Sequence, residues 1–261
     1  MPIIRMMPDT LNAEVVKFAQ KPLGQPVFVN SVPKCGTHLL RNILRMFTPV
    51  EQQYDVQFIQ WPNLQEHLAA FDPQRNFLSW GHLLFSDDSA IELQHVRKLV
   101  LVRDPYDWVL ARARFFLSDE FSGNIDQVKG GALSIEALLN LMIFGVYQKA
   151  PPLAEIFTHN AVAWLGTGCH LVRYEELVAA VKDLDSQASK AYFAALFSAC
   201  GTAMPADWRD RVRIGADRKR SSTARENLTM DDAGIPETLP ELQKKLVNYI
   251  APGLRDILGY K

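Results

Sequence analysis

A strand, a tight loop and a helix follow one another over residues 27–47, and this unit constrains the fold more than any other part of the sequence. Its first three residues are apolar and β-branched or aromatic, which is typical of a buried strand. Pro33 and Gly36 then interrupt the pattern. From Thr37 onward, apolar side chains recur at helical spacing, with polar side chains on the other face. The pattern predicts a βα unit whose connecting loop carries Lys34.

The loop of this unit has the chemistry of an anion site. The N–H groups in the first turn of a helix have no intrahelical partners, and the helix dipole places positive potential there. Gly36 lets the backbone approach a ligand, Lys34 adds a full charge, and Thr37 can cap the helix or bond the anion. An ordinary βα turn with a solvated lysine would contain the same residues, so the loop alone leaves both interpretations open.

The loop differs from a Walker A motif, because it lacks the second glycine and its lysine precedes the glycine. Its Pro-Lys-Cys-Gly-Thr sequence instead resembles the Pro-Lys-x-Gly-Thr loop of sulfotransferases that use 3′-phosphoadenosine 5′-phosphosulfate (PAPS) and release adenosine 3′,5′-bisphosphate (PAP). In that family the loop binds the 5′-phosphosulfate. The resemblance implies that the donor is bound by Pro33, Lys34, Cys35, Gly36, Thr37 and His38.

Composition limits the partners of the chain. Its 261 residues are 48% hydrophobic and carry a formal net charge of −1, which favours neither nucleic acid nor an anionic membrane as a partner. No apolar run is long enough to cross a bilayer, and residues 1–10 lack the apolar core of a signal peptide. The three distant cysteines indicate neither a zinc site nor a disulfide framework. We expect a single sulfotransferase domain over residues 1–261, in a cytoplasmic protein that needs no metal.

A histidine follows the next predicted strand. Residues 77–80 read as a strand that Gly81 ends, so His82 lies at the carboxyl end, where open α/β sheets bind ligands. Most single histidines are structural, and His82 alone would not indicate catalysis. Gly81-His82-Leu83 resembles the family's Gly-His-Leu or Thr-His-Leu segment. The resemblance implies that His82 takes the proton of the acceptor hydroxyl, a task that suits imidazole near neutral pH.

A third strand is predicted at residues 97–102, which end in a continuous apolar run of the parallel-sheet kind. An Arg-Asp-Pro-Tyr-Asp segment follows from Arg103, whose guanidinium could pair with an aspartate or bind phosphate. The segment resembles the family's 3′-phosphate motif, Arg-Asn/Asp-Pro-x-Asp-x-x-x-Ser, but Ala111 stands where that motif has serine. The resemblance implies that Arg103 binds the 3′-phosphate with one hydroxyl ligand missing, for which Arg112 is a candidate replacement.

A fourth strand is predicted to lead into a helix at residues 169–177. Its Arg-Tyr-Glu-Glu-Leu sequence, which begins at Arg173, resembles a recurrent segment of the same family. The resemblance implies that Tyr174 lies near the adenine. Tyrosine is also common at half-buried strand positions, so the segment by itself permits a structural role.

Residues 205–229 are rich in arginine and poor in apolar side chains, a pattern that usually marks a solvated face. The end of this stretch resembles the end of the family's C-terminal nucleotide loop, which opens with Arg-Lys-Gly. The stretch lacks that glycine, and Ala224 stands where tryptophan is usual. The resemblance implies that the 3′-phosphate is also contacted by Arg218, Lys219 and Arg220.

Together these segments predict an α/β fold, with a P-loop-NTPase-like parallel sheet flanked by helices on both faces. They occur in the family's order, and each follows a predicted strand, so one sheet edge would bring them together. The implied reaction is in-line transfer of a sulfuryl group from PAPS to a small-molecule or glycan hydroxyl. Residues 50–75 and 119–131 are expected to face this acceptor, whose identity the sequence leaves open. A homodimer is compatible with the sequence.

Two alternatives remain open at this point. Cys35 and Arg41 have the spacing of Cys-dependent phosphatases, in which a strand–loop–helix also holds phosphate and a thiolate attacks it. The departures at Ala111 and in the C-terminal loop are compatible with a catalytically inactive nucleotide-binding homologue.

Overall fold

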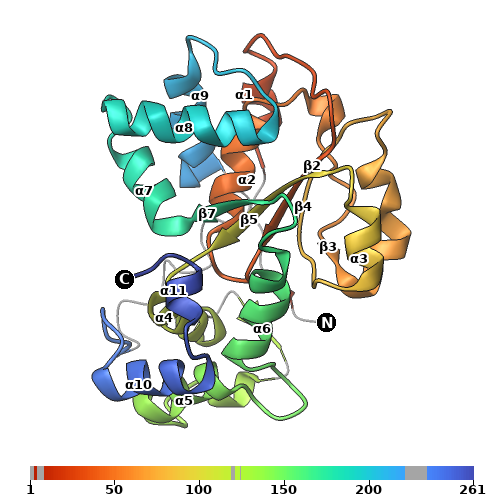
Figure 1. Cartoon of the computed structure of the whole chain (residues 1–261). Coiled ribbons are helices and arrows are strands. Elements are labelled where there is room, and N and C mark those ends of the chain that lie inside the picture. The colour runs from red at the N-terminus through yellow and green to blue at the C-terminus, as the bar shows by residue number, and fades with distance from the viewer. Residues whose placement is uncertain (1–2, 5–8, 119–120, 124, 221–233) are drawn as a thin grey trace.

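A five-stranded parallel sheet forms the centre of the computed structural model (Figure 1). The structure describes residues 3–4, 9–118, 121–123, 125–220 and 234–261. The order across the sheet is β3-β4-β2-β5-β7, and every neighbouring pair is parallel. The five strands are β2 (Val27–Ser31), β3 (Ile59–Gln60), β4 (Leu78–His82), β5 (Arg97–Val102) and β7 (His170–Arg173). A separate antiparallel pair consists of β1 (Ile3–Ile4) and β6 (Phe121–Ser122).

Helices cover both faces of the sheet. In the view of Figure 1, α2, α7, α8 and α9 lie above it, and α4, α5, α6, α10 and α11 lie below it. The α-helices are α1 (Leu11–Val15), α2 (Thr37–Arg45), α3 (Asp87–Glu92), α4 (Pro105–Leu117), α5 (Ile135–Phe144), α6 (Leu153–Asn160), α7 (Tyr174–Lys182), α8 (Gln187–Cys200), α9 (Trp208–Ala216), α10 (Glu241–Ile250) and α11 (Leu254–Ile257). The 3₁₀ helices are η1 (Val50–Gln52), η2 (Trp61–Phe71), η3 (Asp126–Val128), η4 (Val162–Trp164) and η5 (Arg218–Arg220).

The two central strands, β2 and β5, are buried along most of their length because helices cover the sheet on both sides. All five residues of β2 are buried, and Val29 lies between Trp80 of β4 and Leu99 of β5. The last four residues of β5 have no exposed surface. This is the burial expected of a parallel sheet with helices on both faces, and it confirms the predicted fold class. No helix in the described ranges is long and apolar enough to cross a membrane.

The arginine-rich stretch after residue 205 is only partly a solvated face. Its first part is the helix α9, which packs on α2. Gly215 permits this contact, since a Cβ there would lie 2.7 Å from the Cα of Ile43. Arg211 is buried and donates to the carbonyls of Ala19 and Met46. Arginines that donate to carbonyls at a helix interface have the same sequence signature as solvated ones, so the sequence does not distinguish Arg211 from its exposed neighbours.

Two helices are shorter than their sequence patterns indicate. The patterns of residues 9–20 and 134–149 are typical of amphipathic helices, but α1 ends at Val15 and α5 ends at Phe144. Gly145 has a φ of 80°, and a Cβ there would lie 2.6 Å from the carbonyl oxygen of Ala150. A close chain crossing therefore ends α5 before its apolar pattern ends.

Candidate functional site

The loop between β2 and α2 turns sharply at the carboxyl edge of the sheet. Lys34 has a φ of 68° and Gly36 a φ of 93°, both in the left-handed region. This conformation costs a residue with a Cβ, such as Lys34, roughly 1–2 kcal/mol. The Pro33 carbonyl accepts a hydrogen bond from Trp108 Nε1 at 2.5 Å, which ties the loop to α4. The loop thereby holds the first-turn N–H groups of α2, beginning at Thr37, at the sheet edge.

Gly36 is in close contact with an aromatic ring from another strand end. A Cβ on Gly36 would lie 2.5 Å from Cδ2 of Tyr174, so only glycine permits the ring to lie there. The same ring also lies beside Arg103, with 4.8 Å between the ring centroid and the guanidinium carbon. Tyr174 therefore connects the loop to the arginine that follows β5.

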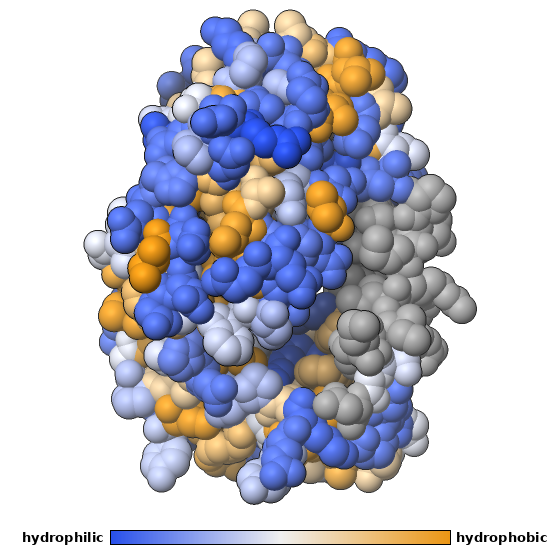
Figure 2. All heavy atoms as spheres, turned by 90° about the vertical axis from the view of Figure 1, so that its right-hand side faces the viewer, coloured by the Kyte–Doolittle hydropathy of each residue, from blue (hydrophilic) through white to orange (hydrophobic). Residues whose placement is uncertain are grey.

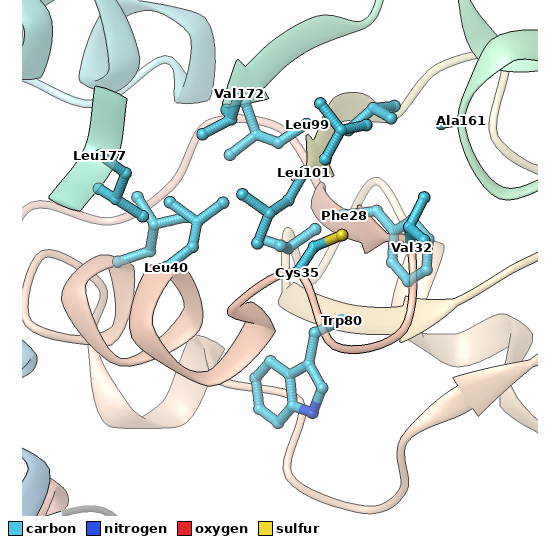
Figure 3. Close-up of a cluster of buried hydrophobic side chains, with 14 of the residues drawn as sticks. Phe28, Val32, Cys35, Leu40, Trp80, Leu99, Leu101, Ala161, Val172 and Leu177 are labelled. Atoms are coloured by element: carbon cyan, nitrogen blue, oxygen red, sulfur yellow. The ribbon is translucent and has the colours of Figure 1, made fainter. Parts of the chain in front are cut away.

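Cys35 points away from the site and into the core. It has no exposed surface, and it belongs to the cluster of buried hydrophobic side chains in Figure 3, with Phe28, Val32 and Leu101. Burial raises the pKa of the thiol well above its usual range. Arg41 donates to Asp55 at 3.0 Å instead of facing the loop. Cys35 and Arg41 therefore do not form the thiolate nucleophile and the loop arginine of a Cys-dependent phosphatase.

His82 is the last residue of β4 and is held against the end of β2. Its Nδ1 lies 2.8 Å from the carbonyl oxygen of Ser31 and 3.0 Å from the Ser31 hydroxyl. A carbonyl can only accept, so we assign the ring hydrogen to Nδ1, which leaves Nε2 as an acceptor. The ring of Phe58 packs edge-on against the imidazole, with a centroid distance of 4.6 Å. Burial lowers the pKa of His82 to about 4.

Lys34 lies in the loop and His38 in the first turn of α2. The Nζ of Lys34 lies 2.9 Å from the centroid of the buried Phe115 ring. Within the described residues, the buried Nδ1 of His38 has no hydrogen-bond partner. Burial, with the charges of Arg41 and Lys34, lowers the pKa of His38 to about 3. Both imidazoles near the loop are therefore neutral at pH 7.

Arg103 follows β5 and has unused hydrogen-bonding capacity. In the part of the chain that the structure describes, its Nε is buried without a hydrogen-bond partner. The neighbouring Asp104 instead caps α4 through the N–H of Tyr106 and pairs with Arg255 at 2.9 Å. A buried guanidinium nitrogen without a partner is costly in a folded protein, and an anionic ligand would satisfy it.

The charged residues beside Tyr174 join the C-terminus to the sheet. Glu175 accepts from the backbone N–H of Asp104 at 3.0 Å and from the hydroxyl of Tyr260 at 2.9 Å. Burial beside this carboxylate raises the pKa of Tyr260. Arg173 donates to the carbonyl of Leu258 at 2.7 Å. The flanks of the Arg-Tyr-Glu segment are thus structural, and its tyrosine contacts the loop at Gly36.

Arg112 does not replace the missing serine hydroxyl at Ala111. It is buried and donates to the carbonyls of Met142 and Pro151 at 2.8 and 2.9 Å. Burial lowers its pKa to about 10, so it remains charged at neutral pH. The hypothesis that Arg112 compensates for Ala111 is wrong, because its Nη1 and Nη2 instead donate to carbonyls of α5 and of the segment between α5 and α6.

The predicted C-terminal nucleotide loop begins at η5. Arg220 pairs with Glu14 at 2.6 Å and with Asp217 at 3.3 Å, and Lys219 is exposed. The side chain of Arg218 and residues 221–233, with Ala224 among them, lie outside the described residues. The contact of these three basic residues with a 3′-phosphate stays a prediction.

On the side expected to face the acceptor, aromatic residues differ in exposure. Tyr54 is buried and its hydroxyl lies 2.9 Å from Nδ1 of His67, so it belongs to the scaffold. Trp61 is 49% exposed, and Phe58 contacts His82. Figure 2 shows the face of the molecule on the β3 side as largely hydrophilic, with a hollow in its lower half. Phe58 is therefore the aromatic residue of this region that lies beside the proposed base.

The sequence interpretation missed three residues that build the site: Ser31, Trp108 and Phe115. Ser31 is the last residue of β2, and a small polar side chain at the end of an apolar run next to the loop was an available signal. Trp108 and Phe115 read as ordinary core positions of α4, and nothing in the sequence links them to the loop. Among the described residues, no three metal-ligating side chains gather into a metal site.

The arrangement of strands and helices is shared with a known enzyme fold. The mouse sulfotransferase SULT7A1, solved in complex with PAP, superimposes with a TM-score of 0.58 over 96% of this chain and 93% of that one. The two sequences are 14% identical over this match. No protein-family model and no curated protein sequence matches the chain. At this level of identity, the match establishes a common sulfotransferase-type α/β fold.

Proposed function

We propose that this chain is a sulfotransferase that moves a sulfuryl group from PAPS to a hydroxyl acceptor. The observation that carries the proposal is the contact between His82 and Ser31. It leaves Nε2 as a hydrogen-bond acceptor beside a loop that has helix N–H groups and Lys34. A neutral base and an anion-binding loop at one sheet edge are what transfer from an anionic donor to a hydroxyl requires.

The residues at the site fit the donor. Among the described residues, the N–H groups of Thr37 and His38 in the first turn of α2 remain for a 5′-phosphosulfate, whereas those of Cys35 and Leu39 donate to the carbonyls of Val32 and Gly36. The buried, unpartnered Nε of Arg103, among the residues described, suits the 3′-phosphate. Tyr174, packed between Gly36 and Arg103, offers a ring face near both groups.

PAPS would supply an activated sulfuryl group on a phosphate oxygen. In the reaction, the acceptor oxygen forms a bond to sulfur while the bond from sulfur to the bridging phosphate oxygen breaks. Nε2 of His82 takes the proton that the acceptor oxygen loses. Lys34 and the loop N–H groups stabilise the negative charge that develops on the bridging oxygen. Arg103 holds the nucleotide in position, and Arg218, Lys219 and Arg220 are proposed to assist it.

The phosphatase alternative is disfavoured by the position of Cys35. Its sulfur is buried in the core with a raised pKa, whereas a nucleophilic cysteine needs an accessible thiolate. A Cys35→Ala variant is therefore expected to keep its transfer activity. Loss of all activity in a variant that remains folded would return the thiol to consideration.

The experiment that tests the proposal is calorimetric binding of PAP, with 5′-AMP and Mg-ATP as comparison ligands. We expect PAP to bind tighter than 5′-AMP by roughly tenfold or more, because hydrogen bonds to a charged group contribute about 1.5–3 kcal/mol. Arg103→Ala should remove this preference. Arg213→Ala is the matched control, since Arg213 is exposed on α9 and pairs there with Asp210.

Each outcome distinguishes a different function. Two results together support the sulfotransferase. PAP binds tighter than 5′-AMP only when Arg103 is present, and PAPS is consumed when members of a panel of hydroxyl acceptors are added. Equal affinity for PAP and 5′-AMP would refute the assignment of a 3′-phosphate site. Tight PAP binding without transfer to any phenol, alcohol or sugar would favour the nucleotide-binding homologue.

A further inference from the structure

A chain of hydrogen bonds connects the proposed base to the anion-binding loop. His82 Nδ1 lies 3.0 Å from the Ser31 hydroxyl, which lies 2.7 Å from the hydroxyl of Thr37. Thr37 is the first residue of α2, at the end of the loop that would bind the donor. Ser31 and Thr37 are both buried. The three side chains come from the ends of β4 and β2 and from the start of α2.

The direction of this chain follows from its acceptors. Because the Ser31 carbonyl lies 2.8 Å from Nδ1, the ring nitrogen carries the hydrogen and the Ser31 hydroxyl cannot donate to it. That hydroxyl can donate to Thr37 Oγ1 at 2.7 Å or to the carbonyl of Gly81 at 3.4 Å. The shorter bond is the stronger one, so Ser31 donates to Thr37. Thr37 then keeps its own hydrogen for an anion at the loop.

We propose that Ser31 is a positioning residue that couples the state of His82 to the donor bound at the β2–α2 loop. The inference rests on the proposed function and adds a residue and a mechanism to it. The single hydrogen on Nδ1 is shared between the Ser31 carbonyl, which fixes the ring orientation, and the Ser31 hydroxyl, which links the ring to Thr37. The two halves of the reaction, deprotonation of the acceptor and stabilisation of the departing oxygen, then share one hydrogen-bonded path.

The coupling acts in both directions. When Nε2 takes the acceptor's proton, the imidazolium becomes a stronger donor at Nδ1, and each hydroxyl along the chain is polarised toward the loop. Thr37 then donates more strongly to the anion as negative charge develops there. Conversely, an anion at Thr37 polarises the chain and makes the ring a better base. Every hydrogen in the chain stays on its own atom, and only the acceptor's proton is transferred.

The test is nuclear magnetic resonance of the ¹⁵N-labelled histidine rings, titrated with PAP. The chain has six histidines, and the His82→Gln variant identifies the His82 signals by their loss. We expect His82 to be neutral at pH 7 with hydrogen on Nδ1, and PAP to shift its Nδ1 resonance. In Ser31→Ala the hydrogen should stay on Nδ1, because the backbone carbonyl remains, but the PAP-induced shift should fall by half or more.

Two serine variants separate this role from a structural one. Ser31→Thr keeps a hydroxyl and should restore the response of His82 to PAP. Ser79→Ala is the matched control, since Ser79 is equally buried on β4 but its hydroxyl faces the carbonyl of Val27. It should leave the response of His82 unchanged. An undiminished PAP response in folded Ser31→Ala would overturn the inference.

A measurement without nucleotide separates this inference from the proposed function. In the free protein, Thr37→Val should shift the Nδ1 resonance of His82. When residue 31 is already alanine, Thr37→Val should no longer shift this resonance. If PAP fails to bind the wild-type protein but this coupling is present, the proposed function fails and the hydrogen-bonded chain stands. If PAP binds and Thr37→Val leaves His82 unchanged, the chain fails and the proposed function stands.

Discussion

Arg103 and Arg112 show how two arginines of one segment can have opposite tasks. Arg103 precedes α4, lies near the ring of Tyr174, and keeps a buried Nε without a partner among the described residues. Arg112 lies within α4, near the ring of Trp108, and donates to the Met142 and Pro151 carbonyls. Arg112 is thus part of the scaffold, whereas Arg103 has a donor left for a ligand. The comparison shows that residue type alone does not distinguish the two arginines, whereas their hydrogen-bond partners do.

The same distinction applies to the two sides of the site. On the scaffold side, Arg45 is buried. Its three guanidinium nitrogens all donate hydrogen bonds, to Gln53, Asp9 and Asn12. On the ligand side, the buried Nδ1 of His38 has no partner within the described part of the chain. Substitutions on the ligand side should therefore change binding or turnover, and substitutions on the scaffold side should change stability.

The largest effect is expected at the base. His82→Ala should lower turnover, measured with the best acceptor of a hydroxyl panel, by roughly 10²-fold or more, because general-base catalysis contributes about that much. His159→Ala is the control, since this histidine is exposed on α6. Turnover within a few-fold of the wild type in His82→Ala would remove His82 from the mechanism. Lys34→Ala should show a comparable loss, because it removes a charge from the leaving side.

The comparison of the two arginines predicts opposite outcomes for one substitution. Arg112→Met should lower the free energy of unfolding by about 2–4 kcal/mol, because it leaves two carbonyls without donors, and should leave PAP affinity unchanged in the folded fraction. Arg103→Met should lower PAP affinity by roughly tenfold or more and leave the free energy of unfolding within about 1 kcal/mol of wild type. Denaturant unfolding and calorimetry measure both quantities. A loss of PAP affinity in folded Arg112→Met would contradict the assignment.

The substitution Gly36→Ala tests the contact between the loop and the ring of Tyr174. Gly36→Ala places a Cβ 2.5 Å from the ring of Tyr174 in a left-handed backbone, so the ring or the loop must move. Gly166→Ala is the matched control, because its φ of 80° carries the same backbone strain with no atom within 4 Å of the new Cβ. We expect Gly166→Ala to lose about 1 kcal/mol of stability and Gly36→Ala to lose more, because the ring of Tyr174 or the loop must also move. Only Gly36→Ala should lose PAP affinity, and equal affinities for both would show that the contact is not part of the site.

The sequence predicted the fold and the strand ends better than the partners of individual side chains. The strand expected at residues 97–102 has those bounds in the structure, and His82 lies at the end of its strand as expected. The expectation that Gly81 ends this strand is wrong, because β4 continues through Gly81, where a Cβ would collide with the carbonyl of Ile59 on the neighbouring strand. A continuous apolar run is a local signal, and it is sufficient to predict a buried parallel strand. The order of the strands then brings their carboxyl ends to one edge.

The direction of a loop side chain and the partner of a buried donor depend on distant residues. Cys35 lies in a turn, where no periodicity tells an inward from an outward side chain. The role of Ser31 depends on the register that pairs Asn30 with Gly81 and so places His82 beside Ser31. The carbonyls that bind Arg112 come from the region of α5 and α6, far along the chain. None of these contacts has a local sequence signal.

The smallest expected effect concerns pH and stability. The folded protein holds His82 and His38 neutral, with pKa values of about 4 and about 3, against an ordinary value of 6.5. Between pH 6.5 and 4 the unfolded chain binds protons at these residues and the folded chain does not, so the free energy of unfolding falls as the pH is lowered. Each histidine contributes roughly 1 kcal/mol for each pH unit in this window.

His38→Gln should therefore reduce the loss of thermal stability between pH 7 and pH 5. The variant removes one of the two histidines that the folded state keeps neutral, and glutamine can still form hydrogen bonds at that position. His159→Gln removes an exposed histidine on α6 and should keep the wild-type dependence. Thermal unfolding followed by circular dichroism at both pH values measures the difference. Among the described residues, Nδ1 of His38 has no hydrogen-bond partner, so a nucleotide at the loop should affect it. PAP should therefore change the pH dependence of thermal stability more in the wild type than in His38→Gln. An equal effect of PAP in the two proteins would place His38 with the scaffold residues.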